Sequence, residues 1–327
     1  MSLSRRALLT APVLAFPTIA ACGVQQRSAD PPAPFPADRA PRSGPPRPPG
    51  ADPSIITAES VGTAPPAGAS AAGTPAETAH PTANSTASAT PSRTEIISRY
   101  QGVQPTAWGL EVAGVITRLP TRDRVIALTF DACGGPHGSG YDRALIDCLR
   151  ENGTAATLFL NSRWIDANPR VCRDLAAEPL FEIANHGTVH RPLSVSGRSA
   201  YGISGTHDAG EVFDEIAVNR DRIQALVGHP PRFFRAGTAH CDNVATAIVA
   251  DLGEHVVNFD VNGDAGATFS AGQVTRAVLT ARPGSIVIAH LNHPEGGTAR
   301  GFAKALPQLA AAGYRFVRLS DQIGTAR

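Results

Sequence analysis

Residues 125–135 read VIALTFDACGG, and the prediction of the fold starts from this stretch. Apart from Thr129, every residue before Asp131 is apolar, which is typical of a strand that is buried on both faces. Gly134 and Gly135 then end the strand in a tight loop. Asp131 therefore stands at the carboxyl end of a buried strand, where sheets with helical crossovers place their catalytic groups. Taken alone, the same aspartate also fits a simple cap of the following turn.

Strand and helix patterns alternate about seven times in this part of the chain, counting the strand at 125–131 as the first. We expect further strands at residues 156–160, 182–186, 233–235, 256–259, 286–289 and 314–319, and helices at residues 141–151, 163–177, 211–227, 244–252, 273–280 and 301–312. A short apolar stretch at residues 110–116 is expected to add an edge strand. The alternation predicts an α/β fold with a parallel sheet, either an incomplete (β/α) barrel or an open doubly wound sheet.

The beginning of the chain has the pattern of an export signal. Arg5 and Arg6 precede a short apolar run that ends in small residues before Cys22, which predicts a twin-arginine signal peptide over residues 1–22 with a lipobox-like cleavage site. In this interpretation Cys22 carries a lipid and becomes the first mature residue. The alternative is simple secretion after an ordinary signal peptide.

Composition separates a linker from a single folded domain. Residues 23–95 are rich in Pro, Ala, Ser and Thr and poor in large apolar residues, so we expect a disordered linker before a domain at residues 96–327. The formal net charge of the 327-residue chain is +1, which gives no indication of a nucleic-acid partner. No apolar run reaches the ~20 residues of a membrane-spanning helix, so we expect membrane contact only through the lipid at Cys22. The expected protein is a monomer of the cell envelope, either lipid-anchored or secreted.

Four cysteines remain when Cys22 is assigned to the lipid. An even number of cysteines in an exported domain allows two disulfides, with three possible pairings. Because Cys148 and Cys172 fall in the first two expected helices, and Cys133 and Cys241 each follow a strand, we predict the pairs Cys148–Cys172 and Cys133–Cys241.

Ionisable side chains stand at the carboxyl ends of successive expected strands, which would bring them to one mouth of the fold. These residues are Asp131, His186, Arg235, Asp260 and His290. His186 and His190 are four residues apart, a spacing that allows both imidazoles to bind one metal ion. A carboxylate expected nearby favours a metal site over a chance pair of histidines.

The order of these motifs resembles the polysaccharide deacetylases, also called family four carbohydrate esterases. The similarity covers residues 124–320 and is carried by 129–131, 186–190, 234–235 after 228–231, Asp260 and 288–290. It implies a distorted barrel with fewer than eight strands, so the expected fold is an incomplete (β/α) barrel of about seven parallel strands with surrounding helices.

The resemblance also implies roles for individual residues in a metal-dependent deacetylation. Asp131 would be the general base and His290 the general acid, Arg235 would hold Asp131 ionised, Asp260 would support Arg235, and His186 and His190 would bind a divalent metal, with Zn²⁺ as the expected ion. Backbone amides at residues 237–239 would stabilise the oxyanion.

The sequence departs from the family pattern at Ala132, where the family has a second aspartate that binds the metal. An alanine cannot bind a metal ion, so another side chain must replace it or the site is inactive. The candidates are Cys133, His137 and Asp142 on the first loop, His240 and Asp242 on the third, and Asp131 itself. Cys133 cannot serve both as a thiolate ligand and as half of a disulfide.

Three classes of function are compatible with these observations. The leading hypothesis is a hydrolase that acts on carbon–nitrogen bonds other than peptide bonds, or on esters, and removes acetyl groups from an envelope or extracellular polysaccharide. The alternative is an impaired relative that binds glycan or metal without turnover. A glycosidase would need two carboxylates that flank a cleft, and Asp260 and Asp264 are too close in sequence to form that pair.

Overall fold

The computed structural model describes residues 90–324, and its central element is β3 (Val125–Ala132). All eight residues of β3 are buried. Its even-numbered residues, from Ile126 to Ala132, join a core cluster with side chains of the covering helices α2 (Arg143–Glu151) and α8 (Thr298–Ala311). Val125 and Ala127 instead join a cluster formed by other strands. The two-residue period of the strand thus separates a helix-covered face from an inner face.

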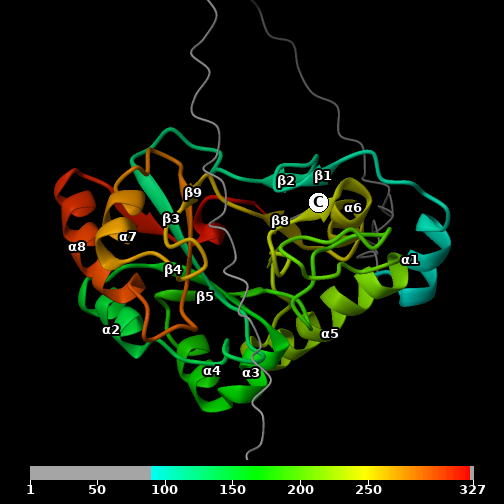
Figure 1. Ribbon diagram of the computed structural model, residues 1–327, viewed down its shortest axis with the longest axis horizontal. Helices are drawn as coiled ribbons and strands as arrows, with labels where there is room; N and C mark the ends of the chain where they lie inside the picture. Colours follow the sequence, from blue (N-terminus) through cyan, green and yellow to red (C-terminus); the bar gives the residue numbers. More distant parts are fainter. Residues whose placement is uncertain (1–89, 325–327) are drawn as a thin grey trace, which may run out of the picture. The chain divides into compact units, whose positions relative to one another are not determined.

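The sheet confirms the expected parallel architecture, an incomplete barrel with surrounding helices (Figure 1). It has nine strands, paired in parallel in the order β2 (Val115–Ile116), β8 (His255–Val257), β6 (Phe233–Phe234), β5 (Phe181–Asn185), β4 (Ala156–Leu160), β3, β10 (Ile286–His290) and β9 (Val261–Asn262), with β11 (Arg315–Val317) on β3. In this register Asp131 lies beside His290, and Asn185 lies beside Phe234. The carboxyl ends of the strands therefore meet at one mouth.

Helices follow most strands, as the alternation predicts. The remaining ones are α1 (Arg93–Tyr100), α3 (Ser162–Ala167), α4 (Pro169–Ala176), α5 (Ala209–Val227), α6 (Asn243–Asp251) and α7 (Ala271–Val278). The single helix expected at 163–177 is two helices, because Asn168 leaves the helical region at φ −131° and Pro169 starts a new helix at its first position. Within residues 90–324 no helix combines the length and apolar character needed to cross a bilayer.

The beginning of the folded part differs slightly from the expected boundary. α1 begins at Arg93, inside the linker expected at 23–95, and a capping box formed by Ser92 and Glu95 fixes its start. The signal peptide expected at 1–22, with Cys22, and the linker up to residue 89 lie outside the described residues.

Both predicted disulfides are wrong in this structure, because Cys133, Cys148, Cys172 and Cys241 are all free. Cys148 and Cys172 pack as apolar side chains in the same core cluster. Cys241 is buried in a second cluster under α5 and α6, where burial raises the pKa of its thiol to about 11. The thiol of Cys133 points elsewhere, toward two histidines.

A buried carboxyl beneath the mouth is a source of pH dependence. Glu254 is fully buried before β8, and its two oxygens accept hydrogen bonds of 3.2 and 3.1 Å from Asn185 Nδ2. Burial raises the pKa of Glu254 well above 4.5, and the bond from Asn185 opposes this shift only in part. Between pH 4.5 and the raised pKa of the folded state, Glu254 therefore keeps a proton that it releases in the unfolded chain.

We expect the stability of the protein to fall as pH rises above about 4.5, by up to about 1.4 kcal/mol per pH unit from this group until Glu254 ionises in the folded state. Glu254→Gln should remove this component and flatten the profile. Urea unfolding between pH 4.5 and 8 measures the slope for both proteins. Identical slopes would contradict the assignment.

Candidate functional site

Asp131, at the end of β3, forms the centre of the mouth and is almost fully buried. Its Oδ1 accepts a 2.7 Å hydrogen bond from Arg235 Nη1, and its Oδ2 lies 3.6 Å from His186 Nε2. Burial alone would raise the pKa of Asp131, but the positive charges of Arg235, His186 and His290 lower it below its ordinary value. The carboxylate is therefore ionised at neutral pH.

Arg235, directly after β6, is buried completely, and its guanidinium binds groups of β3 and of β8 with the residue that follows it. Besides Asp131, its guanidinium donates to the carbonyl oxygen of Val257 at 2.9 Å, to Thr129 Oγ1 at 3.0 Å and to the carbonyl oxygen of Asn258 at 3.2 Å. The expected pairing of Arg235 with Asp131 is present. A planar fork of donors suits this geometry, which a lysine could not reproduce.

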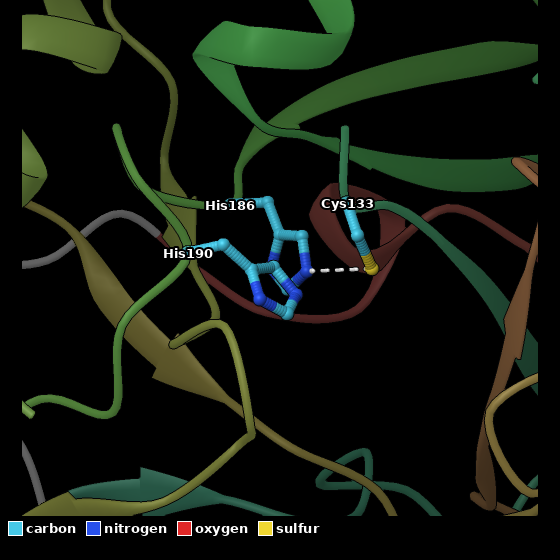
Figure 2. A group of neighbouring side chains, drawn as sticks. All are labelled: Cys133, His186 and His190. Atoms are coloured by element: carbon cyan, nitrogen blue, oxygen red, sulfur yellow. Dashed lines mark hydrogen bonds between the residues drawn. The ribbon is translucent and has the colours of Figure 1, made fainter. Parts of the chain in front are cut away.

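Cys133, His186 and His190 form a second group at the same mouth (Figure 2). Their potential ligand atoms all lie within 4.8 Å of one another, and Cys133 Sγ lies 3.8 Å from His186 Nε2. The two imidazole rings stand nearly perpendicular, with centroids 4.9 Å apart. His186 Nδ1 donates to the carbonyl oxygen of Arg235 at 2.9 Å, which directs its Nε2 toward the cluster.

The pleat of β3 explains why Cys133, and not Ala132, lies beside the two histidines. Ala132 faces the helix-covered core, whereas residues 131 and 133 point to the opposite face, into the mouth. The other candidate ligands are engaged elsewhere or exposed: Asp142 and Asp242 cap α2 and α6, His240 bonds the carbonyl of Thr238, and His137 is exposed. Asp131 binds Arg235 through Oδ1, and it is not among the three residues whose potential ligand atoms all lie within 4.8 Å of one another.

The chemistry of the three donors fits a metal ion. Burial alone would raise the pKa of Cys133, but the hydrogen bond with His186 and the neighbouring imidazoles of His190 and His290 lower it well below its ordinary value, which favours the thiolate that metals bind. His190 Nε2 is buried and has no hydrogen-bond partner among the described residues. The 3.8 Å between Cys133 and His186 is close to the about 3.6 Å expected for sulfur and nitrogen ligands of a tetrahedral Zn²⁺.

A buried carboxylate of α5 holds the backbone around His190. Glu215 accepts hydrogen bonds from the backbone N–H of Val189 at 3.0 Å and of Arg191 at 3.1 Å. His190 adopts a left-handed conformation, with φ 64°, between them. Gly187 lies so close that a Cβ there would be 2.4 Å from Glu215, so this position also requires glycine. Glu215 is a positioning residue that the sequence analysis missed.

His290, at the end of β10, is oriented by Asp264, which the sequence analysis also missed as a site residue. His290 Nδ1 lies 2.9 Å from Asp264 Oδ1, and the backbone N–H of His290 donates to Oδ2 at 2.7 Å. Thr298 donates a further hydrogen bond to Oδ2 at 3.0 Å. Burial alone would lower the pKa of His290, but the charge of Asp264 raises it well above its ordinary value.

Two expected contacts are absent from the described part of the chain. Asp260 does not support Arg235: it pairs with Arg118 and accepts hydrogen bonds from Ser285 at 2.9 Å and from the backbone of Ile286 at 2.8 Å. Of the three amides expected to form an oxyanion hole, those of Gly237 and Ala239 donate to the carbonyls of Arg191 and Ala236, and only that of Thr238 has no such partner among the described residues. The position of a residue at the end of a strand predicts whether it reaches the mouth, but not which side chain or carbonyl it contacts there.

Comparisons with known proteins agree with this geometry. A sequence profile of the family described as Polysaccharide deacetylase matches residues 118–257, which include Asp131, Cys133, both histidines of the cluster and Arg235. The chain is 28% identical over 221 residues to a peptidoglycan-N-acetylglucosamine deacetylase of Bacillus cereus, covering 65% of this chain and 94% of the relative. It is 27% identical over 175 residues to a chitooligosaccharide deacetylase of Bradyrhizobium, covering 53% of this chain and 73% of the relative.

Solved structures share the fold. A pseudoenzyme of carbohydrate esterase family 4 from Bacillus anthracis superposes with a TM-score of 0.55 at 19% identity, covering 65% of this chain and 69% of that protein. At this level of identity the similarity shows the fold alone.

We expect Cys133→Ala to weaken Zn²⁺ binding by more than the about 10–100-fold that the loss of an outer partner costs, because a ligand is removed. Chelator competition measures the affinity, and Co²⁺ loading should give a thiolate charge-transfer band only when Cys133 is present. Cys148→Ala, in the hydrophobic core, is the control. Unchanged Zn²⁺ affinity in Cys133→Ala would exclude the cysteine as a ligand.

Glu215→Gln should weaken metal binding by about 10-fold or more, because the glutamine amide group would oppose the backbone donors around His190. Glu211→Gln is the matched control, since Glu211 lies one turn earlier in α5 and binds Arg191 and His207 on the surface. The same chelator competition is used, with thermal unfolding of the metal-free proteins to separate stability from affinity. Equal affinities in the two variants would show that Glu215 does not position the loop.

Proposed function

We propose that the chain is a divergent member of the polysaccharide deacetylase family and that it removes acetyl groups from an N- or O-acetylated polysaccharide by metal-dependent hydrolysis. The observation that carries this proposal is the cluster of Cys133, His186 and His190 beside two ionisable groups of opposite character. Asp131 is held as an anion and His290 as a cation. Acyl hydrolysis needs this combination of a base and an acid.

The three cluster residues are proposed to hold a divalent ion. Zn²⁺ suits one thiolate and two imidazoles best, and when bound it would polarise the acetyl carbonyl and lower the pKa of a water molecule. A fourth, open position is typical of catalytic zinc sites with three protein ligands. The thiolate replaces a carboxylate of the family pattern, so the negative charge of the ligand set is kept.

Asp131 is proposed to accept the proton of the attacking water. Its Oδ1 is occupied by Arg235, while Oδ2 faces His186 and the cluster, so one oxygen remains directed toward the reacting atoms. The ion pair keeps the carboxylate ionised despite its burial. Arg235 acts through Asp131 and is a positioning residue.

His290 is proposed to protonate the leaving nitrogen or oxygen. Asp264 binds Nδ1, which leaves Nε2 to carry the proton that is donated. Because Asp264 raises the pKa of His290, the imidazolium persists at neutral pH even though the ring is largely buried. Asp260, which the sequence predicted beside Arg235, has no role in this proposal. The carboxylate that supports a catalytic side chain here is Asp264, beside His290.

The substrate is proposed to be an N-acetylated sugar polymer of the cell envelope. The relatives that the chain matches are named as deacetylases of peptidoglycan N-acetylglucosamine and of chitooligosaccharide, which makes amide hydrolysis the leading reaction. The arginine pair at residues 5–6 and the lipobox-like Cys22 support export and lipid anchoring, and the linker would give a monomeric domain reach into the wall.

A binding protein without turnover is the second candidate. The alanine at position 132 favours it, and the fold also occurs in a family pseudoenzyme. Binding alone, however, requires neither an ionised carboxylate beside an arginine nor an imidazolium beside a carboxylate. The presence of both pairs favours the enzyme.

The test is acetate release from N-acetylated chito-oligomers and from peptidoglycan fragments by purified protein, before and after chelation and Zn²⁺ readdition. We expect Asp264→Asn to shift the alkaline limb of the pH profile to lower pH. The charge that raises the pKa of His290 is lost, and only the protonated imidazole acts as an acid.

Asp260→Asn is the matched control, because its carboxylate lies outside the cluster and contacts Arg118. Its alkaline limb should match that of the wild type. Metal binding without acetate from any of the acetylated glycans would reject the enzyme in favour of the binding protein.

A further inference from the structure

A buried asparagine stands between the two segments that carry the proposed metal ligands. Asn161 follows β4 directly, and β4 lies between β3, which leads to Cys133, and β5, which leads to His186 (Figure 1). Asn161 has no exposed surface. Neighbouring strands of a sheet lie about 4.8 Å apart, so one short side chain at the end of β4 is able to reach the segments on both sides.

The backbone and the side chain of Asn161 bind both of these segments. Its backbone N–H donates to the carbonyl oxygen of Ala132, the residue before Cys133, at 3.1 Å. Its side-chain Nδ2 donates to the carbonyl oxygens of His186 at 2.9 Å and of Gly187 at 2.8 Å. One residue thus connects the backbone that precedes the thiol with the backbone around the first imidazole.

The contacts of Asn161 define the orientation of its amide group. Asn161 Oδ1 accepts a hydrogen bond of 3.1 Å from the backbone N–H of Arg163, as the N-cap of α3. A flipped amide would direct its NH2 group at this N–H and its oxygen at two carbonyl oxygens, so only one orientation satisfies every contact. The side chain therefore has two separable tasks: Oδ1 caps a helix, and Nδ2 binds the histidine loop.

The peptide groups on both sides of His186 are bound by residues at the end of β4. The backbone N–H of His186 donates to the carbonyl oxygen of Leu160 at 3.2 Å, and its carbonyl oxygen accepts from Asn161. The carbonyl oxygen of Gly187 accepts a second hydrogen bond, from the backbone N–H of Ser162 at 3.1 Å. Asn161 is the only partner of the His186 carbonyl within residues 90–324.

We propose that Asn161 is a positioning residue for the metal site, which holds Cys133 Sγ and His186 Nε2 at the 3.8 Å separation that suits one metal ion. This inference rests on the proposed metal-dependent function. Without the Nδ2 donor, the His186 carbonyl is buried without a partner, and the histidine loop is free to relax away from Cys133. The ligands are then no longer preorganised, and the metal binds more weakly.

The alternative is that Asn161 serves the fold alone, as the cap of α3. Serine and aspartate are also good N-caps, so both replace the oxygen that binds the Arg163 N–H while they remove the Nδ2 donor. The shorter side chain of Asn161→Ser leaves the His186 carbonyl unpaired. Asn161→Asp in addition places a carboxylate oxygen beside two carbonyl oxygens. A residue that only caps the helix tolerates both changes without loss of metal affinity.

Metal binding by the full-length protein tests this role without turnover. Chelator competition measures the Zn²⁺ affinity, and Co²⁺ loading reports the thiolate–metal bond through its charge-transfer band. We expect about 10-fold weaker Zn²⁺ binding in Asn161→Ser and about 100-fold weaker binding in Asn161→Asp, the range for outer partners of metal ligands. Asn152→Asp is the matched control and should bind Zn²⁺ as the wild type does, because Asn152 Nδ2 donates to a carbonyl of α2, that of Cys148.

Circular dichroism and thermal unfolding of the metal-free proteins separate folding from metal affinity. Wild-type Zn²⁺ affinity in folded Asn161→Ser would overturn the positioning role, and so would a failure of this cap-preserving variant to fold, which would assign Asn161 to the fold. Absence of Zn²⁺ binding in the wild type would reject the proposed metal site itself. Zn²⁺ binding that does not depend on Asn161 would reject only the positioning role and leave the proposed function standing.

Discussion

Arg235 lies inside the barrel with no exposed surface, and its guanidinium is bound to groups of β3 and β8. Burying a charge is costly unless it is paired, and removal of one partner of such a pair typically costs about 3–5 kcal/mol. Asp131, at the end of β3, therefore has to be ionised to balance the buried charge of Arg235. The ion pair of Asp131 with Arg235 thus fixes the position of the proposed base, and the same arginine connects the carboxyl ends of β3 and β8.

Other buried carboxylates fix the remaining groups of the mouth, each through a different contact. Glu215 binds backbone amides on both sides of His190, and Asp264 binds both the ring and the backbone of His290. Neither carboxylate joins the metal cluster. They set the direction of an imidazole, as outer partners of metal and catalytic histidines commonly do. This support does not involve residue 132, because Ala132 faces the core, while Cys133 lies beside His186 and His190.

The sequence predicts those residues of the site that stand at the carboxyl ends of the expected strands. Asp131, His186, Arg235 and His290 were placed correctly because each follows a buried apolar run, and parallel strands bring their carboxyl ends together. Asp264 and Glu215 were missed because one follows the two-residue strand β9 and the other lies within a helix. Asp260 was assigned by position along the chain, and it turns toward Arg118 and Ser285 instead.

The parallel α/β architecture and the motif residues that reach the mouth follow from the amino-acid pattern alone, because burial and the periods of strand and helix are local properties of the chain. The pattern also restricted the third ligand to a short set of candidates. Of these candidates, the folded chain brings Cys133 to His186 and His190, because the pleat of β3 turns Cys133 toward them while Ala132 faces the core. The tertiary structure also decides that the cysteines are free and that His290 pairs with Asp264. The state of the cysteines and the pairing of His290 with Asp264 depend on distances between segments that are far apart in the chain. A local sequence pattern does not contain these distances.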